Sequence, residues 1–322
     1  MPHRFRAGDN VVVRPWPEIL ATLDADGTLA GLPFMPEMLD WCGRSFRVER
    51  RVEKVCIAAA PPSRGVVRFP AGDVVVLEGP RCGGDAHDGC RRSCKILWKE
   101  AWLAPAGAAT ASPEPPGSGL EELRARLKVK SDGGRYFCQS TELHRATEDF
   151  PGHLRARMAS VALQELRNGD RTPGEMARLV ARWMWAKLVR RLLGDGWLRG
   201  PNKQTPTQTL GLRPGERVRV KSRSDIVATL DQRRRNRGLG ICYEVTLCCG
   251  HESEVRSRVD RIIDERTGLM REMRDTVMLG TMDGRGTLGE ECLCSDVLGD
   301  CPRGELMFWR EIWLERVNTD TR

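Results

Sequence analysis

The stretch that decides the fold is residues 8–24, GDNVVVRPWPEILATLD, because it returns as residues 215–231, GERVRVKSRSDIVATLD. A shift of 207 positions needs no gap from residue 8 to residue 55, and 16 of those 48 aligned residues are identical. Such self-similarity identifies a duplicated module. Two later strings also return, DVVVL (73–77) as DTVML and WKEAWL (98–103) as WREIWL.

The duplicated module has the pattern of a small β domain. Each copy opens with a glycine and a V-x-V alternation, which predicts a strand with one buried face. Several short strands separated by turn residues favour a small barrel. We therefore expect a mainly β protein with some α: two SH3-like or KOW-like β-barrel modules, at 5–104 and 212–317, each with a long insertion after its first strand.

A helical region is expected between the modules, at 120–200. It is flanked by a Pro, Ala, Ser and Gly-rich linker at 105–119 and a second linker at 201–211. Thr172 and Glu175 form a capping box that predicts a helix ending at Leu193, with another helix near 153–167. The apolar spacing of the helix that ends at Leu193 favours packing on a neighbouring element, although a basic helix that carries tryptophans also suits a membrane surface.

The composition bounds the cellular setting. Neither a secretory signal nor a run of eighteen apolar residues is present, so the cytoplasm is the expected compartment. Thiols stay reduced there, and the 12 cysteines then indicate metal ligation or burial rather than disulfides. The net charge of +8 permits contact with nucleic acid or an anionic membrane, but 44 acidic residues among 52 basic ones do not require it.

The strongest local motif is CGGDAHDGCRRSC, residues 82–94, with the spacing Cys-x4-His-x2-Cys-x3-Cys. Ligands this close in sequence converge on an ion at little entropic cost, and glycines at 83, 84 and 89 allow tight turns. Tetrahedral zinc takes four such ligands. The spacing matches no standard zinc finger or ribbon.

The duplication predicts which cysteines act together. Both modules share one Cys-Gly pair followed by a later group of three cysteines. His87 is an alternative to Cys42 in the first site, Cys138 is another possible fourth ligand, and Cys56, Cys242 and Cys248 are assigned to cores or turns. The predicted metal ligands are Cys42, Cys82, Cys90 and Cys94 in the first module, and Cys249, Cys292, Cys294 and Cys301 in the second.

Four thiolates suit zinc or an iron–sulfur cluster, and zinc is preferred because no ferredoxin-like spacing is present. A site filled by four protein ligands would stabilise its module rather than catalyse. The expected function is thus a metal-binding component for binding or assembly. The alternatives are a metalloenzyme in a specialised biosynthetic pathway, with His87 or Glu37 completing an open site, and several cysteines acting only as buried apolar thiols.

Other candidate chemistry is weaker. Three acids recur in both modules, but shared structure explains them as well as shared catalysis does, and no nucleophile and base can be paired. An arginine run offers a nucleic-acid alternative, although the first module lacks it. The recurring acids are Asp24 and Asp231, Glu37 and Glu244, and Glu100 and Glu311; the run comprises Arg233, Arg234, Arg235 and Arg237.

The strings FRAGDNVVVR, EILATLD, GLPFMPEML, CG, FRV and LEG, with the 82–94 cluster and WKEAWL, together resemble a bacterial family of tandem-duplicated, cysteine-rich proteins. The resemblance covers both modules and YFCQSTEL (136–143), nearly the whole chain. It implies this architecture and a recurring cysteine cluster, not a reaction. The second module lacks PFMP and the histidine, so identical roles for the two sites do not follow.

Overall fold

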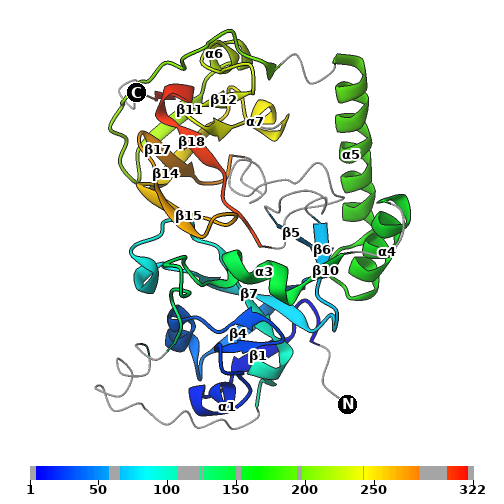
Figure 1. Ribbon diagram of the computed structural model, residues 1–322. Coiled ribbons are helices and arrows are strands. Elements are labelled where there is room, and N and C mark those ends of the chain that lie inside the picture. Colours follow the sequence, from blue (N-terminus) through cyan, green and yellow to red (C-terminus); the bar gives the residue numbers. More distant parts are fainter. Residues whose placement is uncertain are drawn as a thin grey trace, which may run out of the picture. The chain divides into compact units, whose positions relative to one another are not determined.

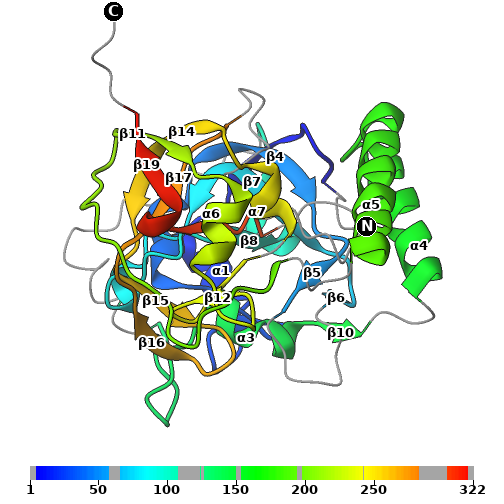
Figure 2. The same ribbon diagram turned by 90° about the horizontal axis from the view of Figure 1, so that it is seen from above.

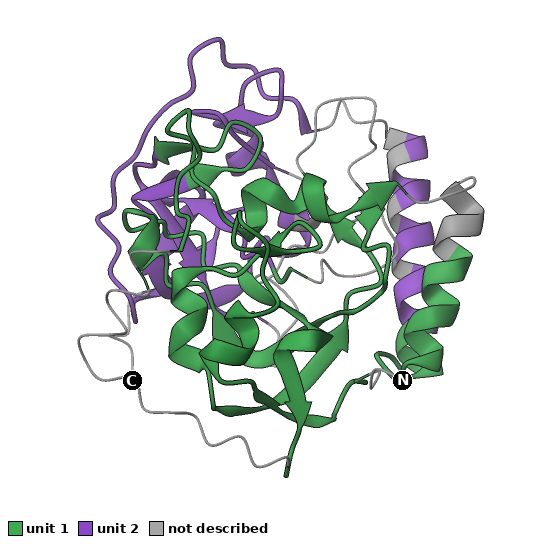
Figure 3. Cartoon of the chain, turned by 60° about the horizontal axis from the view of Figure 1, so that its bottom comes forward, with its two compact units in different colours: residues 1–176, 263–271, 302–304 green, residues 177–262, 272–301, 305–322 purple. Residues whose placement is uncertain are grey.

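The computed structural model describes residues 5–57, 66–107, 124, 127–149, 154–193, 198–241, 243–282 and 303–317 (Figure 1). The chain divides into two compact units, shown in separate colours in Figure 3. Two short segments of the second repeat belong to unit 1, and the predicted helical middle region is divided between the units. Unit 1 comprises Met1–Met176, Ile263–Arg271 and Pro302–Gly304; unit 2 comprises Ala177–Ile262, Glu272–Cys301 and Glu305–Arg322.

Unit 1 contains a five-stranded antiparallel sheet in the order β8-β7-β4-β1-β9. In this sheet β1 lies between β4 and β9, and the 3₁₀ helix η3 (Glu100–Trp102) leads into β9. Val11 and Val13 of the first strand are completely buried. The strands are β1 (Asn10–Val13), β4 (Ser45–Arg51), β7 (Val74–Arg81), β8 (Lys95–Lys99) and β9 (Leu103–Pro105).

Unit 2 contains the same sheet, with the order β18-β17-β14-β11-β19. Its first strand alternates exposed arginines with the buried Val218 and Val220, as predicted. The register is also repeated. Val11 pairs with Phe46 in unit 1, and the residues 207 positions later, Val218 and Ser253, pair in unit 2. The strands, which lie side by side in Figures 1 and 2, are β11 (Arg217–Val220), β14 (Glu252–Arg258), β17 (Thr276–Leu279), β18 (Phe308–Arg310) and β19 (Leu314–Arg316).

A tryptophan–threonine hydrogen bond recurs in the two cores. Trp102 is fully buried, and its Nε1–H donates to Thr22 Oγ1 at 3.1 Å. The counterpart in unit 2 is Trp313 Nε1–H to Thr229 Oγ1 at 3.0 Å. A buried indole N–H usually has a hydrogen-bond acceptor, so the threonine of the repeated ATLD string is explained by this contact. The duplication seen in the sequence is therefore a duplication of structure.

Short elements fill the insertion after each first strand and the connections between the others. The helical spacing of EILATLD and DIVATLD gives only brief helices, because each is followed at once by a tight turn. In unit 1 these elements are α1 (Trp16–Leu20), β2 (Thr28–Leu29), β3 (Leu32–Pro33), η1 (Pro36–Trp41), β5 (Val55–Cys56), β6 (Val66–Arg68) and η2 (Asp85–His87). The second repeat contains α6 (Arg223–Ala228), β12 (Arg235–Asn236), β13 (Leu239–Gly240), α7 (Tyr243–Leu247), β15 (Arg261–Asp264), β16 (Leu269–Glu272) and η5 (Glu311–Trp313).

The region between the repeats is partly helical, as predicted. It contains α3 (Gln139–Ala146), the short strand β10 (Glu148–Asp149), α4 (Leu154–Arg167) and α5 (Pro173–Leu193). The capping box is present, with Glu175 N–H donating to Thr172 Oγ1 at 3.3 Å and Thr172 N–H donating to Glu175 Oε2 at 2.8 Å. Both predicted helices are confirmed.

Only the second of the two predicted linkers is described over its whole length. Positions 108–119 of the first lie outside the described residues. The second is held against unit 2, because Asn202 Nδ2 donates to Leu230 O at 3.0 Å and Arg237 N–H donates to Thr205 Oγ1 at 3.0 Å. Within the described part of the chain, no helix combines the length and apolar character needed to cross a bilayer.

Candidate functional site

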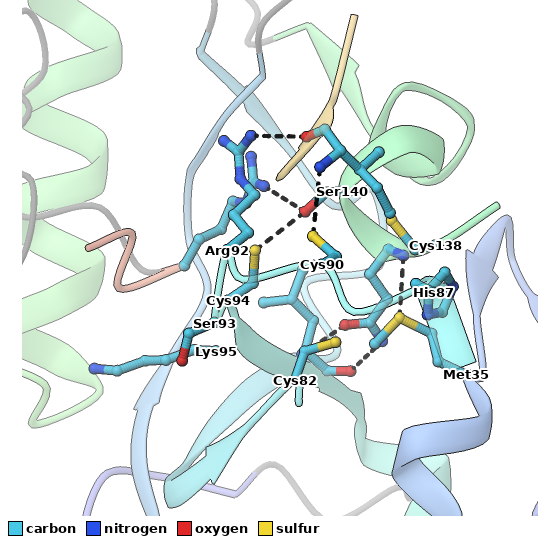
Figure 4. A pocket seen from close by; sticks show the side chains of 14 residues that line it. Met35, Cys82, His87, Cys90, Arg92, Ser93, Cys94, Lys95, Cys138 and Ser140 are labelled. Atoms are coloured by element: carbon cyan, nitrogen blue, oxygen red, sulfur yellow. Dashed lines mark hydrogen bonds between the residues drawn. The ribbon is translucent and has the colours of Figure 1, made fainter. Parts of the chain in front are cut away.

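Four cysteines line one pocket of unit 1 (Figure 4). The pocket is partly open to solvent, and its cavity volume is about 30 Å³. Its walls come from the loop between β7 and β8, from the start of α3, and from the two short segments that the second repeat contributes to this unit. Residues distant in sequence thus surround a single space.

The loop carrying Cys82, Cys90 and Cys94 is closed at its base, where Cys82 N–H donates to Cys94 O at 2.8 Å. Gly84 lies at φ +74°, and a Cβ atom there would stand 2.1 Å from the carbonyl oxygen of Cys90. Only glycine permits this approach. Gly89 also has φ +74°, so the expectation that glycines turn this loop is confirmed at both positions.

Cys138 supplies the fourth sulfur from the N-cap position of α3. The start of this helix is fixed by the buried Gln139, which bridges both backbone groups of Leu97. Leu97 N–H donates to Gln139 Oε1 at 2.9 Å, and Gln139 Nε2 donates to Leu97 O at 2.8 Å. Because Leu97 belongs to β8, Gln139 fixes Cys138 to the sheet that bears the cysteine loop.

Every one of the four sulfurs has a hydrogen-bonding group beside it. For three of them, one donor is the amide two residues further along the chain. Such donors favour the thiolate form over the thiol and are typical of metal-bound cysteines. They are the Gly84 amide at Cys82, the Arg92 and Ile263 amides at Cys90, the Ser140 and Thr141 amides at Cys138, and the Ser140 hydroxyl 3.4 Å from Cys94 Sγ.

Burial acts against ionisation of these thiols. It raises the pKa of Cys82 and of Cys90, and it raises the pKa of Cys138 to about 11. Burial therefore favours the protonated form of these three thiols at neutral pH. A cation in the pocket would reverse this balance, since thiolate is the form that binds metal.

Cys82, Cys94 and Cys138 lie close enough to influence one another electrostatically. Even so, nowhere in the described ranges are three Cys, His, Asp or Glu side chains placed to hold one metal ion together. The predicted zinc-like gathering of ligands around one ion stays a prediction.

His87 lines the pocket, but both of its ring nitrogens are engaged. Nδ1 lies 2.6 Å from Glu37 Oε1, and Nε2 lies 3.1 Å from the carbonyl oxygen of Phe137. Burial alone would lower the pKa of His87, yet the hydrogen bond and charge of Glu37 and the Phe137 carbonyl raise it overall. An imidazole that donates from both nitrogens has no lone pair for a metal, so His87 connects the cysteine loop to the segment before α3.

Cys42 is not among the residues that line the pocket. Its Sγ instead donates to Met38 O at 3.8 Å, and Cys249 donates in the same way to Val245 O at 3.7 Å. The Cys-Gly shared by the two repeats thus closes the same local turn in both. The structure brings Cys138, not Cys42, to the other three sulfurs.

The other predicted cysteines are placed only in part. Cys248 is buried in the core of unit 2, as assigned. The remaining predicted ligands of the second module, Cys292, Cys294 and Cys301, lie outside the described residues, as does Cys242.

The recurring acids have structural partners in both repeats. Asp24 and Asp231 close equivalent turns, accepting from Thr28 N–H at 2.8 Å and Arg235 N–H at 2.9 Å. Glu100 accepts from Phe5 N–H at 3.1 Å and also contacts Arg51. In unit 2 the counterpart, Glu311, accepts from Leu212 N–H at 3.2 Å and Arg258 Nη1 at 2.8 Å. The side chain of Glu244 lies outside what the structure describes.

The arginine run of unit 2 does not present one uniform face. Arg233 and Arg235 are exposed, while Arg234 and Arg237 are half-buried. Arg237 Nη1 lies 2.6 Å from Asp275 Oδ2. Nucleic-acid binding through this run stays a prediction.

Sequence reasoning missed a buried ionic cluster at the rim of the pocket. Arg303 donates to Ser140 Oγ at 2.7 Å and Cys56 O at 3.0 Å, and it contacts Glu265. Arg92 Nη2 lies 2.6 Å from the same Glu265. No spacing in the sequence marks these residues, because they come from segments far apart in the chain.

The fold and the site define a duplicated, mainly β protein in which the first repeat, the start of α3 and parts of the second repeat form a four-cysteine pocket. No family model, curated protein or solved structure matches this chain.

Proposed function

We propose that the protein is a metal-binding protein whose centre lies in unit 1 and is held by Cys82, Cys90, Cys94 and Cys138. The observation that carries the proposal is the convergence of four free cysteines from two separate segments on one pocket. Four cysteines are the ligand set of structural zinc sites and of iron–sulfur clusters.

The surroundings of the sulfurs support metal ligation over ordinary packing. Cys138 and Cys90 also belong to hydrophobic clusters, and Cys82 packs against one, but all four cysteines line the same pocket. Their neighbours also supply N–H and O–H groups directed at sulfur, as the partners of a bound thiolate do. The second repeat contributes one of these donors, the amide of Ile263, 3.4 Å from Cys90 Sγ.

We further propose that each five-stranded sheet is a small SH3-like barrel that serves as the scaffold of a binding or assembly component. Support comes from the strand order, in which the last strand returns beside the first, and from the 3₁₀ helix that precedes it in both repeats.

Metal analysis of the full chain tests the proposal. The protein is purified without oxygen, and bound zinc and iron are measured by inductively coupled plasma mass spectrometry. We expect stoichiometric metal in the unmodified protein and a loss of at least tenfold in Cys90→Ser and Cys138→Ser, because each variant removes one of four ligands.

Cys42→Ser is the matched control, since Cys42 is a free cysteine of the same repeat that does not line the pocket. It should keep its metal. Equal metal contents in Cys42→Ser and Cys138→Ser, or a metal-free unmodified protein, would refute the site. Far-UV circular dichroism establishes that the variants are folded.

A further inference from the structure

We infer that α5 carries a docking surface for an anionic lipid membrane (Figure 1). The surface is an exposed apolar stripe, formed by Met184, Trp185, Leu188 and Leu192, together with the basic side chains beside it. The helix lies flat on the bilayer in this arrangement, with the apolar stripe turned to the lipid. The inference concerns residues outside the cysteine pocket and does not depend on the proposed metal binding.

The apolar stripe is concentrated on one short stretch of helix. Six large hydrophobic side chains are exposed in the described part of the chain, and four of them lie between Met184 and Leu192. Trp185 is 61% exposed, and Leu192 is 72% exposed. Because successive helical residues are turned by about 100°, all four side chains lie within an arc of about 100° around the helix axis. A contiguous apolar patch of this kind, unlike scattered single residues, marks an interaction site.

A different face of α5 is covered by the protein. Met176 and Leu179 are each 7% exposed, and Trp183 is half-buried. Their positions lie roughly opposite the apolar stripe around the helix axis. Ala177 and Ala181, which are exposed, continue the stripe towards the start of the helix without a polar interruption. The stripe is therefore a second apolar face, and packing within the protein does not account for it.

The charges beside the stripe indicate what it binds. Lys187 and Arg191 are exposed along one border, and Arg178 is exposed beside the other. Positions 176–193 contain five basic residues and no acidic residue. Anionic lipid head groups are complementary to such a helix, and long basic side chains reach them while the apolar side chains enter the lipid. Two copies of the chain joined through this stripe would instead bring like charges together.

The residue types of the stripe suit the surface of a bilayer rather than its interior. Tryptophan combines a large apolar ring with a polar N–H, and it is enriched where lipid tails meet head groups. Among the residues that the structure describes, no helix is long and apolar enough to cross a membrane. A helix that has one apolar side and basic borders instead lies in the plane of the interface.

Flotation of the full chain with lipid vesicles tests the inference. The vesicles contain phosphatidylcholine alone or with about 30% phosphatidylglycerol, in about 0.1 M salt. We expect the protein to bind the anionic vesicles at least about tenfold more tightly than the neutral ones, and to lose most of this binding at about 0.5 M salt. Leu188→Gln should weaken binding about tenfold, because an apolar side chain that enters the lipid is replaced by a polar one.

Leu269→Gln is the matched control for the apolar contact. Leu269 lies in β16 and is 52% exposed, compared with 45% for Leu188. This variant should bind vesicles as the unmodified protein does. Lipids with brominated tails should lower the tryptophan fluorescence of the bound protein. Trp185→Phe, which keeps an apolar ring, should still bind but lose most of this quenching.

The charge contribution has a control of its own. Lys187→Gln combined with Arg191→Gln removes two positive charges beside the stripe and should weaken binding to anionic vesicles about tenfold. Lys203→Gln combined with Arg213→Gln removes the same charge from two other exposed positions and should change binding by less than about threefold. Far-UV circular dichroism establishes that all variants are folded.

Three results would overturn the inference. One is equal affinity of Leu188→Gln and Leu269→Gln for anionic vesicles. Another is the absence of vesicle binding by the unmodified protein. The third is a dimer, measured by light scattering, that Leu188→Gln dissociates while no vesicles are bound, which would assign the stripe to a second copy of the chain. None of these results bears on the cysteine pocket, whose test is its metal content.

Discussion

Glu311 is expected to stabilise unit 2 as an acceptor of backbone amides, and Glu311→Gln tests this. The carboxylate is completely buried, and its Oε2 accepts from Leu210 N–H at 2.5 Å and Gly211 N–H at 2.8 Å. Its Oε1 accepts from Leu212 N–H at 3.2 Å and from Arg258 Nη1 at 2.8 Å. Glutamine keeps the shape but can present only one acceptor oxygen.

The cost follows from these contacts. If the amide group replaces Oε2, two part-buried N–H groups lose their acceptor, at about 1 kcal/mol each. The contact with Arg258 changes from an ion pair to a hydrogen bond between a charged donor and a neutral acceptor, which removes about 1 kcal/mol more. We therefore expect a loss of about 3 kcal/mol, a substantial share of a typical unfolding free energy of about 5–15 kcal/mol.

Urea unfolding and hydrogen exchange measure this effect. Mass spectrometry of peptides covering 208–214 should show amide protection about a hundredfold lower in Glu311→Gln, as about 3 kcal/mol requires. The control is Glu315→Gln, an exposed carboxylate 3.4 Å from Arg219, which should change stability by less than about 0.5 kcal/mol. Indistinguishable stabilities of the two variants would refute the structural role assigned to Glu311.

Three further perturbations give separate results. Gly84→Ala should abolish metal binding, measured by mass spectrometry of the metal, because its Cβ would stand 2.1 Å from the Cys90 carbonyl at φ +74°. Asp170→Asn should flatten the pH dependence of unfolding in urea between pH 4 and 6. Burial raises the pKa of Asp170 to about 6 from 3.8, so the protonated carboxyl stabilises the native protein below this window, and that contribution is lost as the pH rises through it. At pH 8 the variant should be about 1 kcal/mol more stable, a value reduced for partial exposure. Thr22→Val should cost about 1–3 kcal/mol by chemical unfolding, since it leaves the buried Nε1–H of Trp102 without an acceptor.

Each of these has a result that would contradict it. Full metal content in Gly84→Ala would show that the loop can open without loss of the site. A pH profile of Asp170→Asn identical to that of the unmodified protein would remove the buried carboxyl as its cause. Thr229→Val is the matched change in unit 2, and a different cost there would show that the two tryptophan contacts are not equivalent.

The fold was largely predictable from residues 8–24 and their copy. A repeat without gaps fixes which strands correspond, and the V-x-V alternation of residues 218–220 indicates the buried face of its strand. The sheet order and the bulges after Val48 and Val255 repeat accordingly. The exchange of residues 263–271 into unit 1 could not be predicted, because it depends on contacts between distant segments.

The candidate site was predictable only in its local part. Cys82, Cys90 and Cys94 lie together because one short loop carries them. Comparison of the repeats predicts Cys42 as the fourth ligand. In both repeats, however, the recurring cysteine, Cys42 or Cys249, makes a local S–H contact with a backbone carbonyl four residues earlier. Cys138 lies outside the repeats, and only the packing of Gln139 against β8 places it at the pocket.

The sharing of segments 263–271 and 302–304 with unit 1 has a consequence for biogenesis. A nascent chain that has emerged from the ribosome only as far as residue 200 lacks both the Ile263 amide and the Arg303 guanidinium that border the cysteines. The complete pocket can form only after nearly the whole polypeptide has been synthesised. Binding of the proposed metal is therefore expected to follow the synthesis of residues 263–304.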